Sequence, residues 1–259
     1  LIHVRMGVRD LLAGIITMTA LFSINLQIAG SNLTIARDVD TIFTAAPTMA
    51  LFGGLNLLTG YAGQISLGAG AFMMVGAYAT FAFQLRLPQV PLPLALIASG
   101  AIAAAVGLVF GAPSSRIKGF YLIVSTLAAQ FFFEWLFLKF PWFYNGNSSA
   151  TIQLPSGLHL GGFSLDTPHG RYFLVLATVA LLSWAALNLV RGQTGRNWQA
   201  VRDMDTAAAV IGVPVRRAKL QAFAVSSAIL GIAGALWAFA YLGSASVQSF
   251  GLTRSYQIL

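Results

Sequence analysis

The sequence predicts an all-α membrane protein, a polytopic bundle of about seven transmembrane helices with a cytoplasmic N-terminus. Of the 259 residues, 57% are hydrophobic and only 8% are charged, whereas soluble domains carry roughly 25% charged residues. Lys and Arg outnumber Asp and Glu by 15 to 7, which gives a formal net charge of +8. These cations are spread among long apolar runs, so the charge indicates membrane topology and not nucleic-acid binding.

Seven apolar runs have the length of a membrane span, roughly 20 residues. The first follows Arg5 and Arg9 as a signal peptide does, but no small-x-small cleavage site followed by a soluble domain comes after it. The expected helices cover 11–30, 41–58, 65–85, 92–112, 120–140, 172–190 and 220–242. Together they form a single transmembrane domain over 1–259. Because the sequence starts at Leu1 and ends in an apolar-leaning stretch at Leu259, we expect the natural chain to be longer.

Lys and Arg are unevenly distributed between the two sides of these helices. With the N-terminus inside, the inner segments hold 10 of them and the outer segments hold 5. Cationic loops stay in the cytoplasm, so this orientation is the expected one. It places 141–170, a Gly-, Ser- and Pro-rich stretch, in a periplasmic loop and 191–219, the most basic stretch, in a cytoplasmic loop.

Small residues recur at four-residue spacing in two of the expected helices. Such spacing lets helix backbones approach closely, so these positions are candidate helix contacts. The pairs are Gly100 with Ala104, Gly107 with Gly111, Gly231 with Ala235 and Gly234 with Ala238.

The run 56–70, NLLTGYAGQISLGAG, predicts a break between two apolar segments. Each glycine disfavours a continuous helix by roughly 1 kcal/mol relative to alanine. Broken backbone at membrane depth is buried in protein or lines a water-filled cavity, as in transporters. Two interpretations stay open, a solute pathway and an ordinary tight turn at the cytoplasmic surface. The polar side chains of the pathway interpretation are Tyr61, Gln64 and Ser66.

The cytoplasmic loop 191–219 contains the pattern of one short amphipathic helix. Gly212 suits its C-terminal cap, and Pro214 prevents its continuation. Two locations stay open for this helix, a groove on a protein partner and the lipid surface that the flanking arginines also favour. The apolar residues at helical spacing are Val201, Met204, Ala208 and Ile211.

Glu134 is the only acidic residue inside an apolar span, one turn after Gln130. A carboxylate within a membrane is costly unless it is paired or hydrated, so both residues are candidates for the translocation pathway. Glu134 lies six residues before the expected outer end of its helix, about 9 Å along the axis. A structural pair with Lys139 and a contact in a water-exposed vestibule therefore stay open beside a role in solute transport.

No enzyme motif is present. The chain has no cysteine, its three histidines are far apart, and it contains neither a phosphate-binding G-x-x-x-x-G-K-[ST] loop nor a nucleophile elbow. We therefore expect no catalytic residue, no metal site and no cofactor on this chain.

Three ordered motifs resemble the permease subunits of branched-chain amino acid ATP-binding-cassette (ABC) transporters. GLNLLTGYAGQISLGAGAFMMVGAYAT (54–80) resembles the family's Gly-Tyr-Ala-Gly-Gln turn and the helix after it, and RIKGFYLIVSTLA (116–128) its fifth helix. GRNWQAVRDMDTAAAVIGVPVRRAKLQAFAVSSAILGIAGALWA (195–238) is similar to its cytoplasmic coupling region. The likeness covers nearly the whole chain from about residue 11. Where many relatives have Gly-Glu in the fifth helix, this chain has Gln130-Phe131, so the solute stays open among branched-chain amino acids, urea, short amides and carboxylates.

The resemblance implies a multi-pass subunit of a bacterial inner-membrane importer. The string 205–212, DTAAAVIG, becomes the counterpart of the motif that docks on the ATP-binding subunit. The implied partners are two ATP-binding subunits that hold ATP and Mg, a second related permease, a periplasmic solute-binding protein and the lipid bilayer. The alternative is a secondary transporter coupled to ions through Glu134. The implied coupling residues are Arg202, Asp205, Ala207, Ala208 and Gly212.

Overall fold

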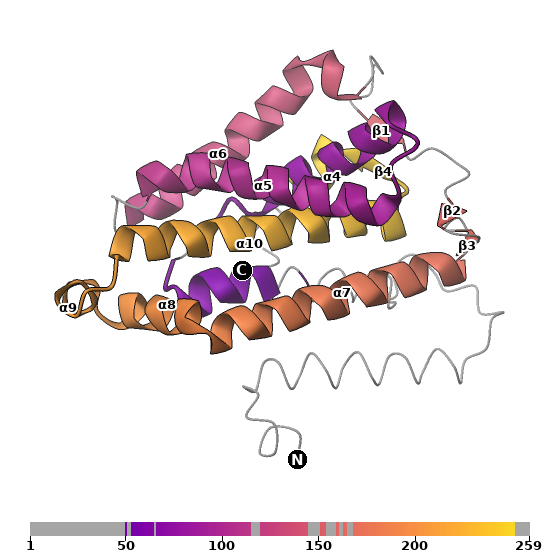
Figure 1. Cartoon of the computed structure of the whole chain (residues 1–259). Coiled ribbons are helices and arrows are strands. Elements are labelled where there is room, and N and C mark those ends of the chain that lie inside the picture. The colour runs from indigo at the N-terminus through magenta and orange to yellow at the C-terminus, as the bar shows by residue number, and fades with distance from the viewer. Residues whose placement is uncertain are drawn as a thin grey trace.

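The computed structural model describes residues 50, 53–64, 66–114, 120–144, 151–153, 159–160, 163–164 and 168–251. Within them the chain is a bundle of helices, which confirms the helical class (Figure 1). Three of the described helices are long and apolar enough to cross a membrane, over Leu92–Ala112, His169–Arg191 and Val215–Ala240. The helices are α4 (Ala69–Arg86), α5 (Leu92–Ser114), α6 (Phe120–Lys139), α7 (Pro168–Arg191), α8 (Gln193–Asp203), α9 (Asp205–Val210) and α10 (Val215–Trp237).

The expected spans 92–112, 120–140 and 172–190 correspond to α5, α6 and α7. The span expected to start at 65 begins only at Ala69, because the backbone before it is not helical. The last span starts earlier than expected, at Val215, and ends in a π-helical turn, Ala238–Leu242. The span 11–30 lies outside the described residues, and so does most of 41–58.

Helix α10 lies at the centre of the bundle, where small residues bring its neighbours close. A methyl group at Gly76 of α4 would collide with the Gly231 carbonyl, and one at Gly107 of α5 would collide with the Ser227 hydroxyl. Gly100 faces Ile232 in the same way. The expectation that Gly100, Gly107 and Gly231 mark helix contacts is confirmed, because close backbone approach is what small residues permit; the sequence analysis did not identify Gly76.

Two short antiparallel ribbons add to the helical fold. Strand β1 (Thr151–Gln153) pairs with β4 (Ser244–Ser246), and β2 (His159–Leu160) pairs with β3 (Phe163–Ser164). The segment expected as one loop, 141–170, is thus tied by β1 to the chain after α10. Figure 1 shows the strands at one end of the bundle and α8 and α9 at the other. The described strands of 141–170 and helices α8 and α9 of 191–219 therefore lie at opposite ends, and which end is cytoplasmic stays a prediction.

Aromatic contacts hold α6 against α4 at the strand-bearing end. The rings of Tyr78 and Phe137 stack with centroids 4.5 Å apart. Arg86, the last residue of α4, donates to the Trp142 carbonyl at 2.6 Å and lies over the indole ring at 3.6 Å. An offset aromatic stack and a cation over a ring each favour this packing beyond simple burial. Together they position the C-terminal half of α6.

Candidate functional site

The predicted break in 56–70 is present. A π-helical turn, Leu57–Tyr61, ends there, and α4 starts only at Ala69. Between them Gly63 has a φ of +66°, a left-handed conformation that glycine adopts without steric cost. Tyr61, Gln64 and Ser66 are all buried. The three polar side chains are thus covered by protein, whereas Gly63 itself is exposed, so a solute pathway and a turn at the surface both stay open.

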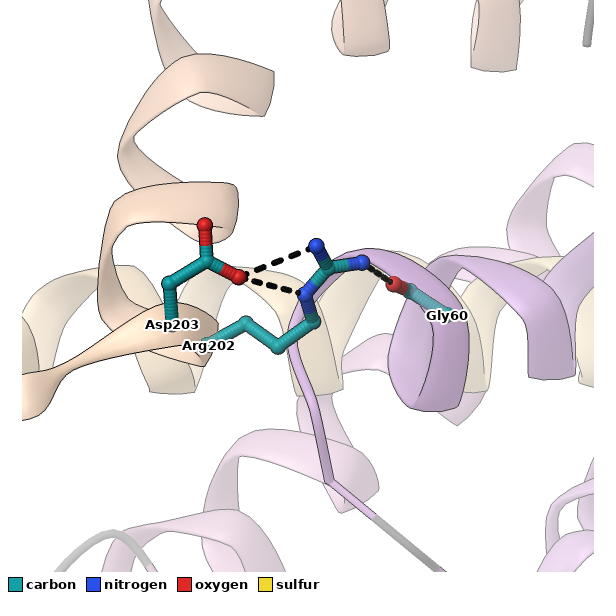
Figure 2. A network of polar contacts seen from close by, with 3 residues as sticks. All are labelled: Gly60, Arg202 and Asp203. Carbon is teal, nitrogen blue, oxygen red and sulfur yellow. Dashed lines mark hydrogen bonds and ion pairs between the residues drawn. The ribbon is translucent and has the colours of Figure 1, made fainter.

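Arg202 of α8 binds this break directly (Figure 2). Its Nη1 donates to the Gly60 carbonyl at 2.6 Å, while its Nε and Nη2 each donate to Asp203 Oδ1 at 3.0 Å. The Gly60 carbonyl lies in the last turn of the π-helix, where helical carbonyls lose their amide partners. A side-chain Cβ at Gly63 would lie 2.6 Å from Arg202 Cγ, so the arginine stem needs glycine there. Helix α8 and the broken turn, which are separate in sequence, thus meet in one site.

A second contact runs from α9 to the same turn. Asp205 begins α9 and forms an ion pair with Lys219 of α10, with Nζ and Oδ2 2.7 Å apart. Both side chains are mostly shielded from solvent, and a shielded pair is stronger than an exposed one. The Lys219 carbonyl in turn accepts from Gln64 Nε2 at 3.4 Å. Asp205 is therefore connected to the break through α10.

Thr126 of α6 contacts the other side of the break. Its hydroxyl accepts the Leu67 amide at 3.0 Å, and Ser66 Oγ accepts the Gly68 amide at 3.3 Å. A Cβ at Gly68 would lie 2.7 Å from the Thr126 carbonyl oxygen. The sequence analysis did not identify Thr126, although it is one helical turn before Gln130 and four-residue spacing puts both on one face of α6.

The single amphipathic helix expected in 191–219 is wrong. The chain instead forms α8 and α9, separated at Met204, whose backbone is extended with φ −158° and ψ 104°. The expected stripe is divided as a result. Val201 and Ala208 are buried, whereas Met204 and Ile211 are exposed. Regular spacing indicated one helix face, but one extended residue reorients everything after it.

The predicted cap at Gly212 is confirmed. Gly212 has a φ of +86°, its amide donates to the Ala209 carbonyl at 3.1 Å, and the Val213 amide donates to the Ala208 carbonyl at 2.9 Å. This pair of bonds with a left-handed glycine is the Schellman motif that ends helices. Pro214 then precedes α10, as the sequence indicated.

The outward surface of α9 differs from the residues that the sequence indicated. Ala208 is only 2% exposed and packs inside the chain, so it holds α9 in place and offers no surface. Val210 and Ile211 are 87% and 74% exposed. Ala207 is exposed as well. Exposed aliphatic side chains that lie next to one another are a candidate contact surface for a partner.

Glu134 is paired with Gln130. Gln130 Nε2 donates to Glu134 Oε1 at 2.8 Å and to the Phe250 carbonyl at 3.0 Å. The structure does not pair Glu134 with Lys139, because residues five apart lie on different faces of a helix. Gln130 is fully buried and Glu134 is half-buried. The sequence analysis did not identify Phe250, which is 120 residues away along the chain.

Comparisons of the sequence with known proteins point to one family. The family model described as the branched-chain amino acid transport system permease component matches residues 38–259. The high-affinity branched-chain amino acid transport system permease protein LivM of Escherichia coli (strain K12) is 32% identical over 247 residues, covering 87% of this chain and 58% of the relative. LivM of Salmonella typhimurium (strain LT2) is 31% identical over 228 residues, covering 80% of this chain and 53% of the relative.

The chain thus spans a little more than half the length of these curated relatives. No solved structure matches it. The family model covers most of the chain, including the broken turn and helices α6, α8 and α9. The chain therefore belongs to the family of multi-pass membrane proteins that form the permease component of branched-chain amino acid transport systems.

Proposed function

We propose that this chain is the permease subunit of a bacterial inner-membrane ABC importer for branched-chain amino acids or a related small polar or carboxylate solute. A periplasmic binding protein delivers the solute, and a second related permease completes the pathway. Two ATP-binding subunits supply the energy and hold ATP and Mg. The names of the LivM relatives support the substrate class.

The observation that carries the proposal is the outward aliphatic surface of α9. Val210 and Ile211 project from a helix that its own chain holds through Ala208 and the Asp205–Lys219 pair. An apolar surface held in a fixed position suits a groove on a partner that moves. Because α9 is fixed to the rest of the chain, a movement of the partner displaces the permease helices and not only a mobile loop. The family resemblance assigns this string to the contact with the ATP-binding subunit.

Transmission then runs through the contacts at the broken turn. Movement of α8 displaces the Gly60 carbonyl through Arg202, and movement of α9 reaches Gln64 through Lys219. A break in a helix is the easiest place for a span to bend, because the intrahelical hydrogen bonds are already interrupted. ATP-driven closure of the partner subunits would thus open or close the pathway at residues 57–68.

The membrane arrangement that goes with this mechanism has about seven spans and a cytoplasmic N-terminus. The excess of Lys and Arg in the inner segments, 10 against 5, supports it. Helix α7 exposes large apolar side chains such as Phe173, Leu181 and Trp184. Apolar side chains on a spanning helix are stable against lipid or against a second permease subunit.

Reconstitution of the complete transporter tests the proposal. Proteoliposomes holding the assembled complex, with ATP on the side of the ATP-binding subunits, should take up labelled leucine only when the binding protein is present on the other side. A variant ATP-binding subunit without its catalytic carboxylate is the matched control and should give no uptake. Leucine uptake driven by a proton or sodium gradient without ATP would contradict the proposal and favour the secondary transporter that uses Glu134.

A further inference from the structure

A row of polar side chains follows one face of the otherwise apolar helix α6. Thr126, Gln130 and Glu134 are spaced four residues apart, so each lies about 6 Å further along the same face. Thr126 contacts the broken turn at Leu67. Gln130 and Glu134 continue from that turn toward the strand-bearing end. The face thus connects the site that the coupling segment moves with the end expected to receive solute.

The orientation of the Gln130 amide is fixed by its partners. Its nitrogen donates to a Glu134 carboxylate oxygen at 2.8 Å and to the Phe250 carbonyl at 3.0 Å. A carbonyl and an ionised carboxylate can only accept hydrogen bonds, so the nitrogen must face them and the oxygen must face away.

The amide oxygen of Gln130 is therefore a free acceptor. It is buried, in a residue that is 0% exposed, and makes no hydrogen bond within the described part of the chain. Glu134 next to it forms no ion pair with any described Lys, Arg or His side chain. A buried unpaired acceptor is rare in proteins and costly to keep. The nitrogen of the same amide is bonded to the Glu134 carboxylate, which has no cationic partner among the described residues, so the two side chains together suit a group that carries both donors and positive charge.

We infer that Gln130 and Glu134 bind the primary ammonium group of the solute. An ammonium group carries three donors and one positive charge, which matches an amide oxygen and a carboxylate with no donor of their own. A carboxylate group would be repelled here, and urea or a neutral amide would lack the charge. The inference rests on the proposed function and deepens it, because it selects solutes with a free amino group from those that the sequence left open.

Two substitutions isolate the charge of Glu134. Glu134→Gln removes the charge but keeps an oxygen that can accept from Gln130 Nε2. Glu134→Asp keeps the charge on a shorter side chain and should rescue part of the binding. Lys139→Gln is the matched control, since it removes a charge from an exposed residue of the same helix.

Saturation-transfer NMR on the complete transporter in nanodiscs measures binding without ATP or the binding protein. The probes are leucinamide, which has the ammonium group and no carboxylate, and isocaproate, which has the carboxylate and no ammonium group. Wild type and Lys139→Gln should bind leucinamide, and Glu134→Gln should bind it roughly tenfold or more weakly, as expected for one lost charge-assisted hydrogen bond. Isocaproate should not bind to the wild-type complex.

Equal leucinamide binding by wild type and Glu134→Gln would overturn the inference, and so would binding of isocaproate as tight as that of leucinamide. Displacement of leucinamide by an equal concentration of sodium would assign the site to a metal cation and overturn it too. If Glu134→Gln fails to assemble, the two probes on the wild-type complex still decide the question. Failure of the proposed function shows separately, as absence of ATP-driven leucine uptake.

Discussion

Helices α8 and α9 come from one stretch of the chain, 191–219, but differ in which side chains they bury. Helix α8 buries Trp198 and Val201 against the rest of the chain and ties Arg202 to the Gly60 carbonyl. Helix α9 buries Ala208 and leaves Val210 and Ile211 in solvent. The difference arises at Met204, where extended backbone separates the two helices. Helix α8 is thus an anchor packed into the permease, whereas α9 presents exposed aliphatic side chains, which under the proposed function contact the ATP-binding subunit.

The largest expected effect concerns Trp198, which anchors α8 in the core. Trp198→Ala should destabilise the fold by about 3–5 kcal/mol, the usual cost of truncating a fully buried tryptophan. Trp184→Ala on α7 is the matched control, because that side chain is largely exposed. Thermal unfolding of the purified permease in detergent measures both. A Trp198→Ala protein as stable as Trp184→Ala would show that α8 is not anchored.

The next effect concerns the outward surface. Replacing Val210 and Ile211 together by Asp should weaken association with the ATP-binding subunit roughly a hundredfold or more, because each aliphatic side chain buried on binding contributes about 1.5–3 kcal/mol. Insertion and permease stability should not change, since both side chains are exposed. Binding of the isolated ATP-binding subunit to immobilised permease provides the measurement. Gln193→Asp, at an exposed position of α8, should bind normally. Unaltered affinity of the double variant would refute a docking role for α9.

A smaller effect is expected at Arg202, which joins α8 to the broken turn. Arg202→Gln removes the charge-assisted bond to the Gly60 carbonyl, worth about 1.5–3 kcal/mol at most and less here because the side chain is partly exposed. We expect less leucine taken up per ATP hydrolysed, with ATP hydrolysis retained. Asp203→Asn breaks the neighbouring exposed ion pair and leaves the Gly60 bond, so its coupling ratio should match wild type. Equal coupling ratios for both variants would remove Arg202 from the mechanism.

The smallest expected effect is at the cap of α9. Gly212→Ala should cost about 1 kcal/mol, because alanine is disfavoured at a φ of +86° although nothing crowds the position. Gly53→Ala has equally open surroundings and no such backbone constraint, so it should be neutral or slightly stabilising. Hydrogen exchange of the α9 amides should quicken only in the Gly212 variant. Unchanged exchange there would show that the cap does not hold α9.

Local signals in the sequence were enough for part of this structure. Apolar runs located α5, α6 and α7, and glycines at four-residue spacing marked the contacts with α10, because hydropathy and small residues act within one helix. The glycine-rich run predicted the break before α4. Gly212 and Pro214 predicted the end of α9, since their backbone preferences are intrinsic.

Other features depended on distant residues and could not be predicted. The pairing of β1 with β4 joins three-residue segments almost a hundred positions apart, which carry no sequence pattern of their own. The chain separates into α8 and α9 at Met204, within a regular apolar stripe. Tertiary packing therefore prevailed over the helical period of the sequence. The free oxygen of Gln130 follows from where Phe250 lies. The Arg202–Gly60 contact likewise became visible only once both segments were placed.

Site-specific cross-linking tests most directly whether the ATP-binding subunit binds to α9. The chain contains no cysteine, so Val210→Cys provides its single thiol for a benzophenone maleimide, and Ala208→Cys is the buried counterpart. In the assembled transporter, irradiation should link position 210 to the ATP-binding subunit and should leave position 208 linked only within the permease, if at all. Adducts of position 210 with lipid alone, or with no protein, would contradict the assignment.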